Sequence, residues 1–145
     1  MKKTFDMQFI RYINLFGKIT GVTPKYCFNY NNMIVFIVPG FAVERAIGRD
    51  NSNLKKLSSI LEKRIRVLAQ PGNLGDLQRF ISVLVAPAQF EKVDVIEGAT
   101  GEKEVVITSG GRENKAMLIG RGHLREQELK EILEENFGVK NLRIN

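Results

Sequence analysis

Two short segments of this sequence combine glycine with cationic and polar residues just before a predicted helix. Gly48-Arg49-Asp50-Asn51 lies in the first half of the chain, and Gly120-Arg121-Gly122-His123 lies 72 residues further on. The first turn of a helix presents unpaired backbone N–H groups and a partial positive charge, so an anion such as a phosphate binds well there. Glycine lets the backbone approach such a ligand closely. The chemistry indicated is therefore non-covalent binding of an anion.

The two segments lie within a longer internal repeat. A shift of 72 residues aligns Ile47-Gly48-Arg49 with Ile119-Gly120-Arg121 and needs no gap on either side. Further aligned pairs are Ile34 with Val106, Val35 with Ile107, Leu57 with Leu129, Ile60-Leu61 with Ile132-Leu133, Glu62 with Glu134, and Val67 with Val139. So many matches in one register predict a duplicated unit of about half the chain. We expect domains at residues 1–70 and 74–145, with Gln70-Pro71-Gly72-Asn73 as the linker.

Both halves are predicted to be α+β, in the order helix, strand, strand, helix, helix, strand. In the first half, hydrophobic spacing and turn residues predict helices at 4–17, 41–47 and 52–63, and strands at 26–30, 33–38 and 65–69. In the second half they predict helices at 74–85, 112–119 and 124–137, and strands at 89–97, 104–108 and 139–144. Asn31-Asn32 is expected to form a two-residue hairpin turn, because Asn tolerates positive φ.

Two of these helices carry residues that could belong either to the core or to a binding surface. The first has aromatic and aliphatic residues at helical spacing and Gly17 at its predicted end; such a row is more typical of a core than of a base-stacking surface. Its members are Phe5, Phe9, Tyr12, Ile13 and Phe16. In the helix at 52–63, the predicted buried residues are Leu54, Leu57, Ile60 and Leu61, and the solvent-facing ones are Lys55, Lys56 and Lys63.

Composition excludes several classes of protein. No apolar run approaches the roughly 20 residues of a membrane span, and the basic start lacks the apolar core of a signal peptide. The single cysteine, Cys27, and the single histidine, His123, exclude an internal disulfide and a His/Cys zinc cluster. No catalytic constellation or Walker-type loop is present. We therefore expect a cytoplasmic protein that is not an enzyme and needs no cofactor or metal.

Charge is distributed unevenly along the chain. Residues 1–72 hold 12 Lys and Arg against 4 Asp and Glu, a net charge of +8, whereas residues 73–145 hold 10 against 12, a net charge of −2. A basic half indicates a polyanionic partner, although the same charge could serve solubility alone.

The order of elements, with a glycine turn between two helices in each half, resembles tandem KH domains of the prokaryotic, type II, variant. The whole of residues 4–145 is similar to the short NusA-like transcription factors of archaea, which consist of two KH units. Four stretches carry this resemblance: 11–22 (RYINLFGKITGV), 33–39 leading into Ala46-Ile-Gly-Arg49, 85–88 (VAPA) and 136–139 (NFGV).

The resemblance implies binding of single-stranded RNA in transcription elongation, termination or antitermination, with RNA polymerase as a second candidate partner. In KH domains the Gly-x-x-Gly turn clamps the backbone of about four nucleotides. Carried onto this chain, the RNA-binding residues are those of the two turns, with Lys55 and Lys56 as auxiliary phosphate contacts. The turn residues are Gly48, Arg49, Asp50 and Asn51, and Gly120, Arg121, Gly122 and His123.

Both turns depart from the KH pattern at their last position. Asn51 and His123 stand where the family has glycine, and Asp50 places a negative charge beside the expected phosphate path. The helix after the second turn is acidic. We therefore expect the first unit to contribute most of the RNA affinity. Alternative interpretations remain for single residues: both glycines as ordinary turn residues, the two lysines as solvated side chains, and His123 as an exposed loop residue. For the whole protein, the alternative is a protein–protein adaptor with KH folds and weak RNA binding.

Overall fold

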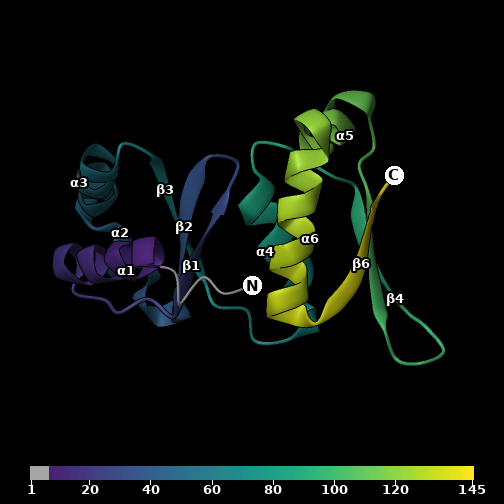
Figure 1. The fold of residues 1–145 in the computed structure, drawn as a ribbon, viewed down its shortest axis with the longest axis horizontal. Coiled ribbons are helices and arrows are strands. Elements are labelled where there is room, and N and C mark those ends of the chain that lie inside the picture. Colours follow the sequence, from purple (N-terminus) through teal and green to yellow (C-terminus); the bar gives the residue numbers. More distant parts are fainter. Residues whose placement is uncertain (1–6) are drawn as a thin grey trace. The chain divides into compact units, whose positions relative to one another are not determined.

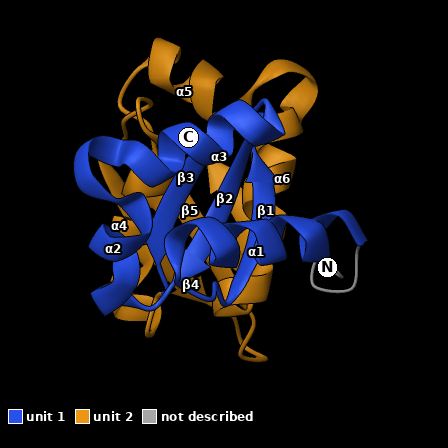
Figure 2. Ribbon diagram, turned by 90° about the vertical axis from the view of Figure 1, so that its left-hand side faces the viewer, with its two compact units in different colours: residues 1–70 blue, residues 71–145 orange. Residues whose placement is uncertain are grey.

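The chain divides between residues 70 and 71 into two units, residues 1–70 and 71–145 (Figure 2). The division falls inside the segment 70–73 that the sequence analysis predicts as a linker. The structure is a computed structural model that describes residues 7–145. Among these residues, no helix is long and apolar enough to cross a membrane.

The first unit has the predicted order of elements around a three-stranded sheet (Figure 1). In the sheet order β1-β2-β3, β1 is antiparallel to β2 and β3 is parallel to it. Asn31 and Asn32 turn the chain between β1 and β2 with φ of 52° and 57°, which confirms the predicted hairpin. The elements are α1 (Met7–Thr20), β1 (Tyr26–Tyr30), β2 (Met33–Val38), α2 (Val43–Ile47), α3 (Ser52–Leu61) and β3 (Arg64–Ala69), with 3-10 turns at Gly40–Ala42 and Arg49–Asn51.

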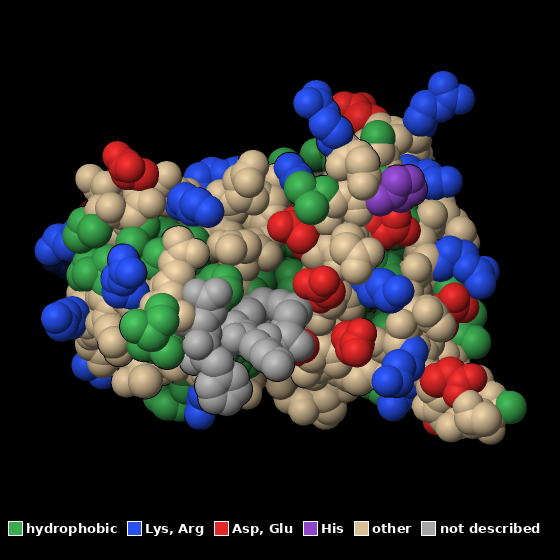
Figure 3. Space-filling view, viewed as in Figure 1, with side chains coloured by type: hydrophobic (Ala, Val, Ile, Leu, Met, Phe, Trp, Pro, Cys, Tyr) green, Lys and Arg blue, Asp and Glu red, His purple; other side chains and the backbone are tan. Residues whose placement is uncertain are grey.

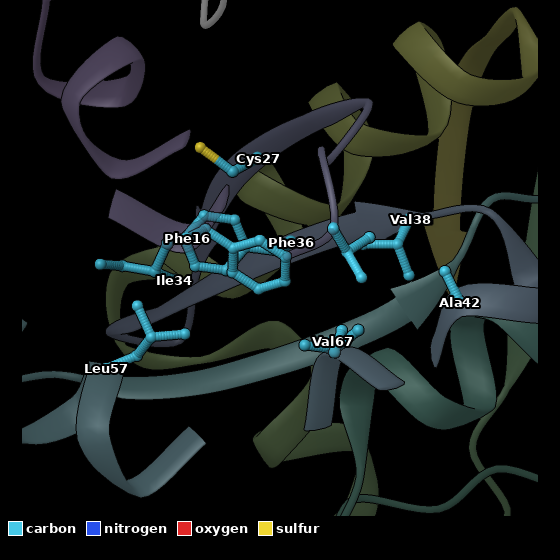
Figure 4. Packing of buried hydrophobic residues seen from close by; sticks show 10 residues of the cluster. Phe16, Cys27, Ile34, Phe36, Val38, Ala42, Leu57 and Val67 are labelled. Atoms are coloured by element: carbon cyan, nitrogen blue, oxygen red, sulfur yellow. The ribbon is translucent and has the colours of Figure 1, made fainter. Parts of the chain in front are cut away.

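Helices α1, α2 and α3 pack on one face of this sheet and form the core of the unit. Phe16 of α1 is fully buried, and its ring stacks on Phe36 of β2 with 4.3 Å between centroids (Figure 4). Phe9, Tyr12 and Ile13 pack against the same cluster, so the aromatic row belongs to the core; Phe5 lies outside the described residues. Other buried members are Cys27, Ile34, Val38, Ala42, Ala46, Leu57 and Val67.

The second unit repeats this arrangement. In its sheet, of order β4-β5-β6, β4 is antiparallel to β5 and β6 is parallel to it. Leu77, Phe80, Ile81 and Leu84 of α4 are buried as predicted, and the ring of Phe80 meets that of Phe137 edge to face at 5.5 Å. The elements are α4 (Leu77–Val85), β4 (Lys92–Glu97), β5 (Lys103–Thr108), α5 (Arg112–Ile119), α6 (Leu124–Phe137) and β6 (Val139–Ile144), with 3-10 turns at Leu74–Asp76 and Arg121–His123.

Five predictions for the first unit are wrong in detail. Helix α2 begins at Val43, after a 3-10 turn, instead of at Phe41, and β3 begins at Arg64, one residue earlier than predicted. Helix α1 continues through Gly17 to Thr20 and ends at Gly21, whose φ is 74°. Helix α3 ends at Leu61 instead of extending to Lys63, because Glu62 adopts a left-handed conformation. Ile60 is 54% exposed and does not belong to the core. At about 100° per residue, Ile60 lies roughly 90° away from the mean direction of the three leucines of α3.

Three boundaries in the second unit also differ, one of them at β5, which begins at Lys103, one residue earlier than predicted. Residues 74–76 form a 3-10 turn before α4, because the side chain of Asn73 accepts a hydrogen bond from the N–H of Gly75 and begins a tighter turn. Strand β4 begins at Lys92, three residues later than predicted. Strands β1, β2 and β6 and helices α5 and α6 have the predicted bounds.

Candidate nucleic-acid interface

The two glycine turns have the same backbone conformation. Gly48 has φ and ψ of 80° and 170°, and Gly120 has 73° and 170°. The third positions, Asp50 and Gly122, and the fourth positions, Asn51 and His123, are all left-handed, with φ between 53° and 64°. In each turn the N–H of the fourth residue donates to the carbonyl of the first glycine at 3.2 Å. Asn51 and His123 at the fourth position thus adopt the same turn in both units.

The first position of each turn requires glycine. A φ near +75° combined with a ψ of 170° belongs to a region that residues with a Cβ essentially do not occupy. A Cβ on Gly48 would also lie 2.8 Å from Oγ of Ser52, and one on Gly120 would lie 3.0 Å from the backbone nitrogen of Arg125. By contrast, a Cβ on Gly122 would meet nothing within 4 Å. The backbone at this third position therefore faces open space.

The helix that follows each turn begins without a side-chain cap. No side-chain oxygen accepts from the first N–H groups of α3 or α6. In α3 no acidic residue lies in the first turn, whereas α6 has Glu126 there. Glu126 pairs with His123, with 2.7 Å between Oε1 and Nδ1. A carboxylate thus already occupies the favourable end of α6, while the corresponding end of α3 remains accessible to an outside anion.

The charged side chains around the two turns differ in sign. Arg49, Lys55 and Lys56 are exposed, and none of the three forms an ion pair within residues 7–145. A shift of 72 residues replaces Lys55 by Gln127 and Lys56 by Glu128, although Arg49 still corresponds to an arginine, Arg121. In the view of Figure 3, most charged side chains around α1 and α3 are basic, whereas several acidic side chains gather around α6. Exposed cations thus occupy all three of these positions, next to a helix start with no acidic residue in its first turn, only in the first unit.

The structure adds two residues that the sequence analysis did not select. Phe41, in the 3-10 turn before α2, has 93% of its surface exposed. Arg45 is exposed on α2, one turn before Gly48. The repeat could have identified Phe41, because the corresponding residue is the charged Glu113 and a charged residue normally marks a solvent-facing position.

No group of three His, Cys, Asp or Glu side chains within residues 7–145 is arranged to hold a metal ion.

The geometry of the first turn is suited to a ligand with a chain of negative charges. The exposed turn, the uncapped helix and the three cations would each contact a different part of such a ligand.

These features define an α+β protein in which a helix, a glycine turn and a second helix occur twice, each time beside a three-stranded sheet. No model of a known protein family matches the chain. The chain is 32% identical to the protein designated APE1850, whose crystal structure matches 97% of this chain and 99% of that one with a TM-score of 0.69. At this identity over nearly the whole of both chains, the two proteins belong to one family.

The chain is also similar to a curated protein over nearly its whole length. The chain is 26% identical over 144 residues to the probable transcription termination protein NusA of Methanococcus vannielii. The match covers 99% of this chain and 80% of that protein.

Proposed function

We propose that this protein is a NusA-like factor of two type II KH domains that binds single-stranded RNA in transcription elongation, termination or antitermination. The observation that carries the proposal is the exposed turn Gly48–Asn51, which leads into the uncapped, basic start of α3. The repeated element order and the parallel β2–β3 and β5–β6 pairs are the features expected of type II KH folds. The similarity to a protein named as a transcription termination factor supports the same role.

In this proposal the first unit provides most of the affinity. Gly48 lets the phosphate backbone come close to the turn, and Arg49 with the two lysines of α3 neutralises phosphates. Asp50 weakens this attraction but lies between Arg49 and the two lysines. The second turn keeps the backbone shape, yet Glu126 and Glu128 place negative charge at the start of α6. We therefore expect Arg121 to contribute less than Arg49.

The test is the affinity of the full-length protein for a short single-stranded RNA, measured by fluorescence anisotropy at several salt concentrations. A charge-assisted contact is worth about 1.5–3 kcal/mol, so Arg49→Glu should weaken binding roughly tenfold or more. Arg121→Glu should have a distinctly smaller effect. Equal losses for the two variants would contradict the unequal roles of the units. Binding that is absent, or unchanged by salt, would contradict the proposal as a whole.

The alternative function is an adaptor that binds a protein of the transcription or ribosome machinery and binds RNA weakly. The observation that favours it is the His123–Glu126 pair, which occupies the second turn with groups of the protein itself. An adaptor predicts no salt-dependent RNA affinity and no effect of Arg49→Glu on binding to its protein partner.

A further inference from the structure

We propose that Phe41 is a stacking surface for one base of the RNA strand that the first turn holds. This inference rests on the proposed function and adds to it a contact outside the glycine turn. Among the large hydrophobic residues of the described chain, Phe41 is the most exposed, at 93%, followed by Met7 at 75% and Leu124 at 55%. Both faces of its ring are therefore open to a flat partner.

Phe41 lies along the same segment as the turn. The 3-10 turn Gly40–Ala42 passes directly into α2, which ends at Gly48. Phe41 lies in the 3-10 turn, Arg45 on the short helix α2, and Gly48 directly after that helix. The segment is anchored in the core by Ala42 and Ala46, which are 5% and 0% exposed. An exposed aromatic residue, an exposed arginine and the glycine turn thus lie on one short, anchored segment.

The distance between the ring and the turn suits one short piece of RNA. Seven residues at about 1.5–2.0 Å per residue, the rises of α- and 3-10 helices, separate the backbones of Phe41 and Gly48 by roughly 10–14 Å. Even fully stacked nucleotides advance about 3.4 Å each, so the four nucleotides that such a turn clamps extend at least about 10 Å. A strand with its backbone at Gly48 could therefore pass Arg45 and reach Phe41 with a base at one end.

The charge of the unit favours a nucleobase as the flat partner. Residues 1–72 carry a net charge of +8, and Arg45 and Arg49 lie on either side of Gly48. An apolar protein partner would gain nothing from this charge, whereas a nucleic acid offers both phosphates and bases. Stacking on an aromatic side chain also accepts every base, because each has a π-face.

Of this arrangement of aromatic ring, arginine and glycine turn, the second unit has only the turn. The shift of 72 residues replaces Phe41 by Glu113 and Arg45 by Met117, while Gly48 corresponds to Gly120. The aromatic ring and the cation are thus absent together, in the unit that also lacks the basic start of its second helix. This coincidence is expected if the ring and the cations serve the same ligand.

The test compares Phe41→Ala, Phe41→Tyr and the matched control Ile60→Ala by RNA affinity. Ile60 is an exposed apolar residue of the same unit, at 54%, at the far end of α3. Since the side chain of Phe41 makes so little contact with the protein, Phe41→Ala should fold normally. The probe is a labelled single-stranded RNA of about five nucleotides, which limits the number of binding registers.

We expect Phe41→Ala to weaken binding roughly five- to hundredfold, and both Phe41→Tyr and Ile60→Ala to bind within about twofold of the unchanged protein. A set of RNAs that each lack one base then identifies the contact. Removal of the base that stacks on Phe41 should weaken binding to the unchanged protein. The same removal should not weaken binding to Phe41→Ala any further, because the base and the ring act as a pair.

Two results would overturn the inference while leaving the proposed function intact. In one, Arg49→Glu weakens binding and Phe41→Ala does not. In the other, Phe41→Ala weakens binding equally for all RNAs of the set, with no coupling to any base. If neither variant changes RNA affinity, the proposed function itself fails.

Discussion

Replacement of the turn glycines by alanine should destabilise the protein in a definite order. Gly122→Ala should have the smallest effect, Gly48→Ala a larger one and Gly120→Ala the largest. Gly122 is left-handed and its Cβ would meet nothing within 4 Å, so only the backbone penalty of about 1–2 kcal/mol applies. The lower entropy of the unfolded alanine chain offsets about 0.4–1 kcal/mol of this.

Replacement of Gly48 or Gly120 carries further energetic costs. Their φ and ψ near +75° and 170° fall in a region essentially restricted to glycine, which adds up to about 3 kcal/mol of strain. At Gly48 the new Cβ would crowd the side-chain ends of Ser52 and Asn53, which can rotate away. At Gly120 it would collide with Cγ of Arg125 and lie 3.0 Å from that residue's backbone nitrogen, which cannot move independently. Overpacking of this kind adds about 1–3 kcal/mol.

Urea denaturation of the full chain measures this order. The three tyrosines, Tyr12, Tyr26 and Tyr30, all lie in the first unit, and the chain has no tryptophan, so tyrosine emission reports on that unit while circular dichroism reports on both. Gly48→Ala should shift the emission transition. The reasoning fails if Gly122→Ala destabilises as much as Gly120→Ala, since backbone conformation and crowding would then not determine the effect.

Three further predictions concern the first unit. Phe16→Ala removes a fully buried ring and should lower the free energy of unfolding by about 3–5 kcal/mol, seen as an earlier tyrosine transition in urea. Asp50→Gly removes an exposed negative charge at a left-handed position; RNA affinity in an anisotropy assay should rise up to about fivefold, and unchanged or weaker binding would contradict this. Lys55→Ala and Lys56→Ala should each reduce the slope of log affinity against log salt by about 0.7, whereas Lys115→Ala, in the acidic unit, should leave the slope unchanged.

Local signals in the sequence predict most of the fold. The hairpin follows from two residues that tolerate positive φ, and α5 and α6 are each bounded by glycine where the helical pattern stops. The end of α1 could not be predicted in the same way, because Gly17 and Gly21 are both plausible ends. Gly17 lies inside the helix, and the chain turns instead at Gly21, whose φ is 74°.

The candidate site was predictable in position but not in detail. The repeat predicts where the two turns lie. It does not predict that both the third and the fourth residue of each turn are left-handed, because the Gly-x-x-Gly pattern places glycine at only one of these positions. The pairing of His123 with Glu126 depends on a side-chain orientation that the sequence does not specify. The exposure of Phe41 does not follow from its residue type, because phenylalanine is most often buried, and it depends on the 3-10 turn in which Phe41 lies.

The comparison of the two turns separates what the backbone provides from what the side chains provide. Both turns have the same dihedral angles and the same internal hydrogen bonds, so a difference in binding between the units cannot originate in the backbone. What differs is the set of side chains around it: Phe41, Arg45, Lys55 and Lys56 in one unit correspond to Glu113, Met117, Gln127 and Glu128 in the other. Since a phosphate chain is attracted by the three cations of the first set and repelled by the two glutamates of the second, the proposed RNA contact should lie mainly on the first unit.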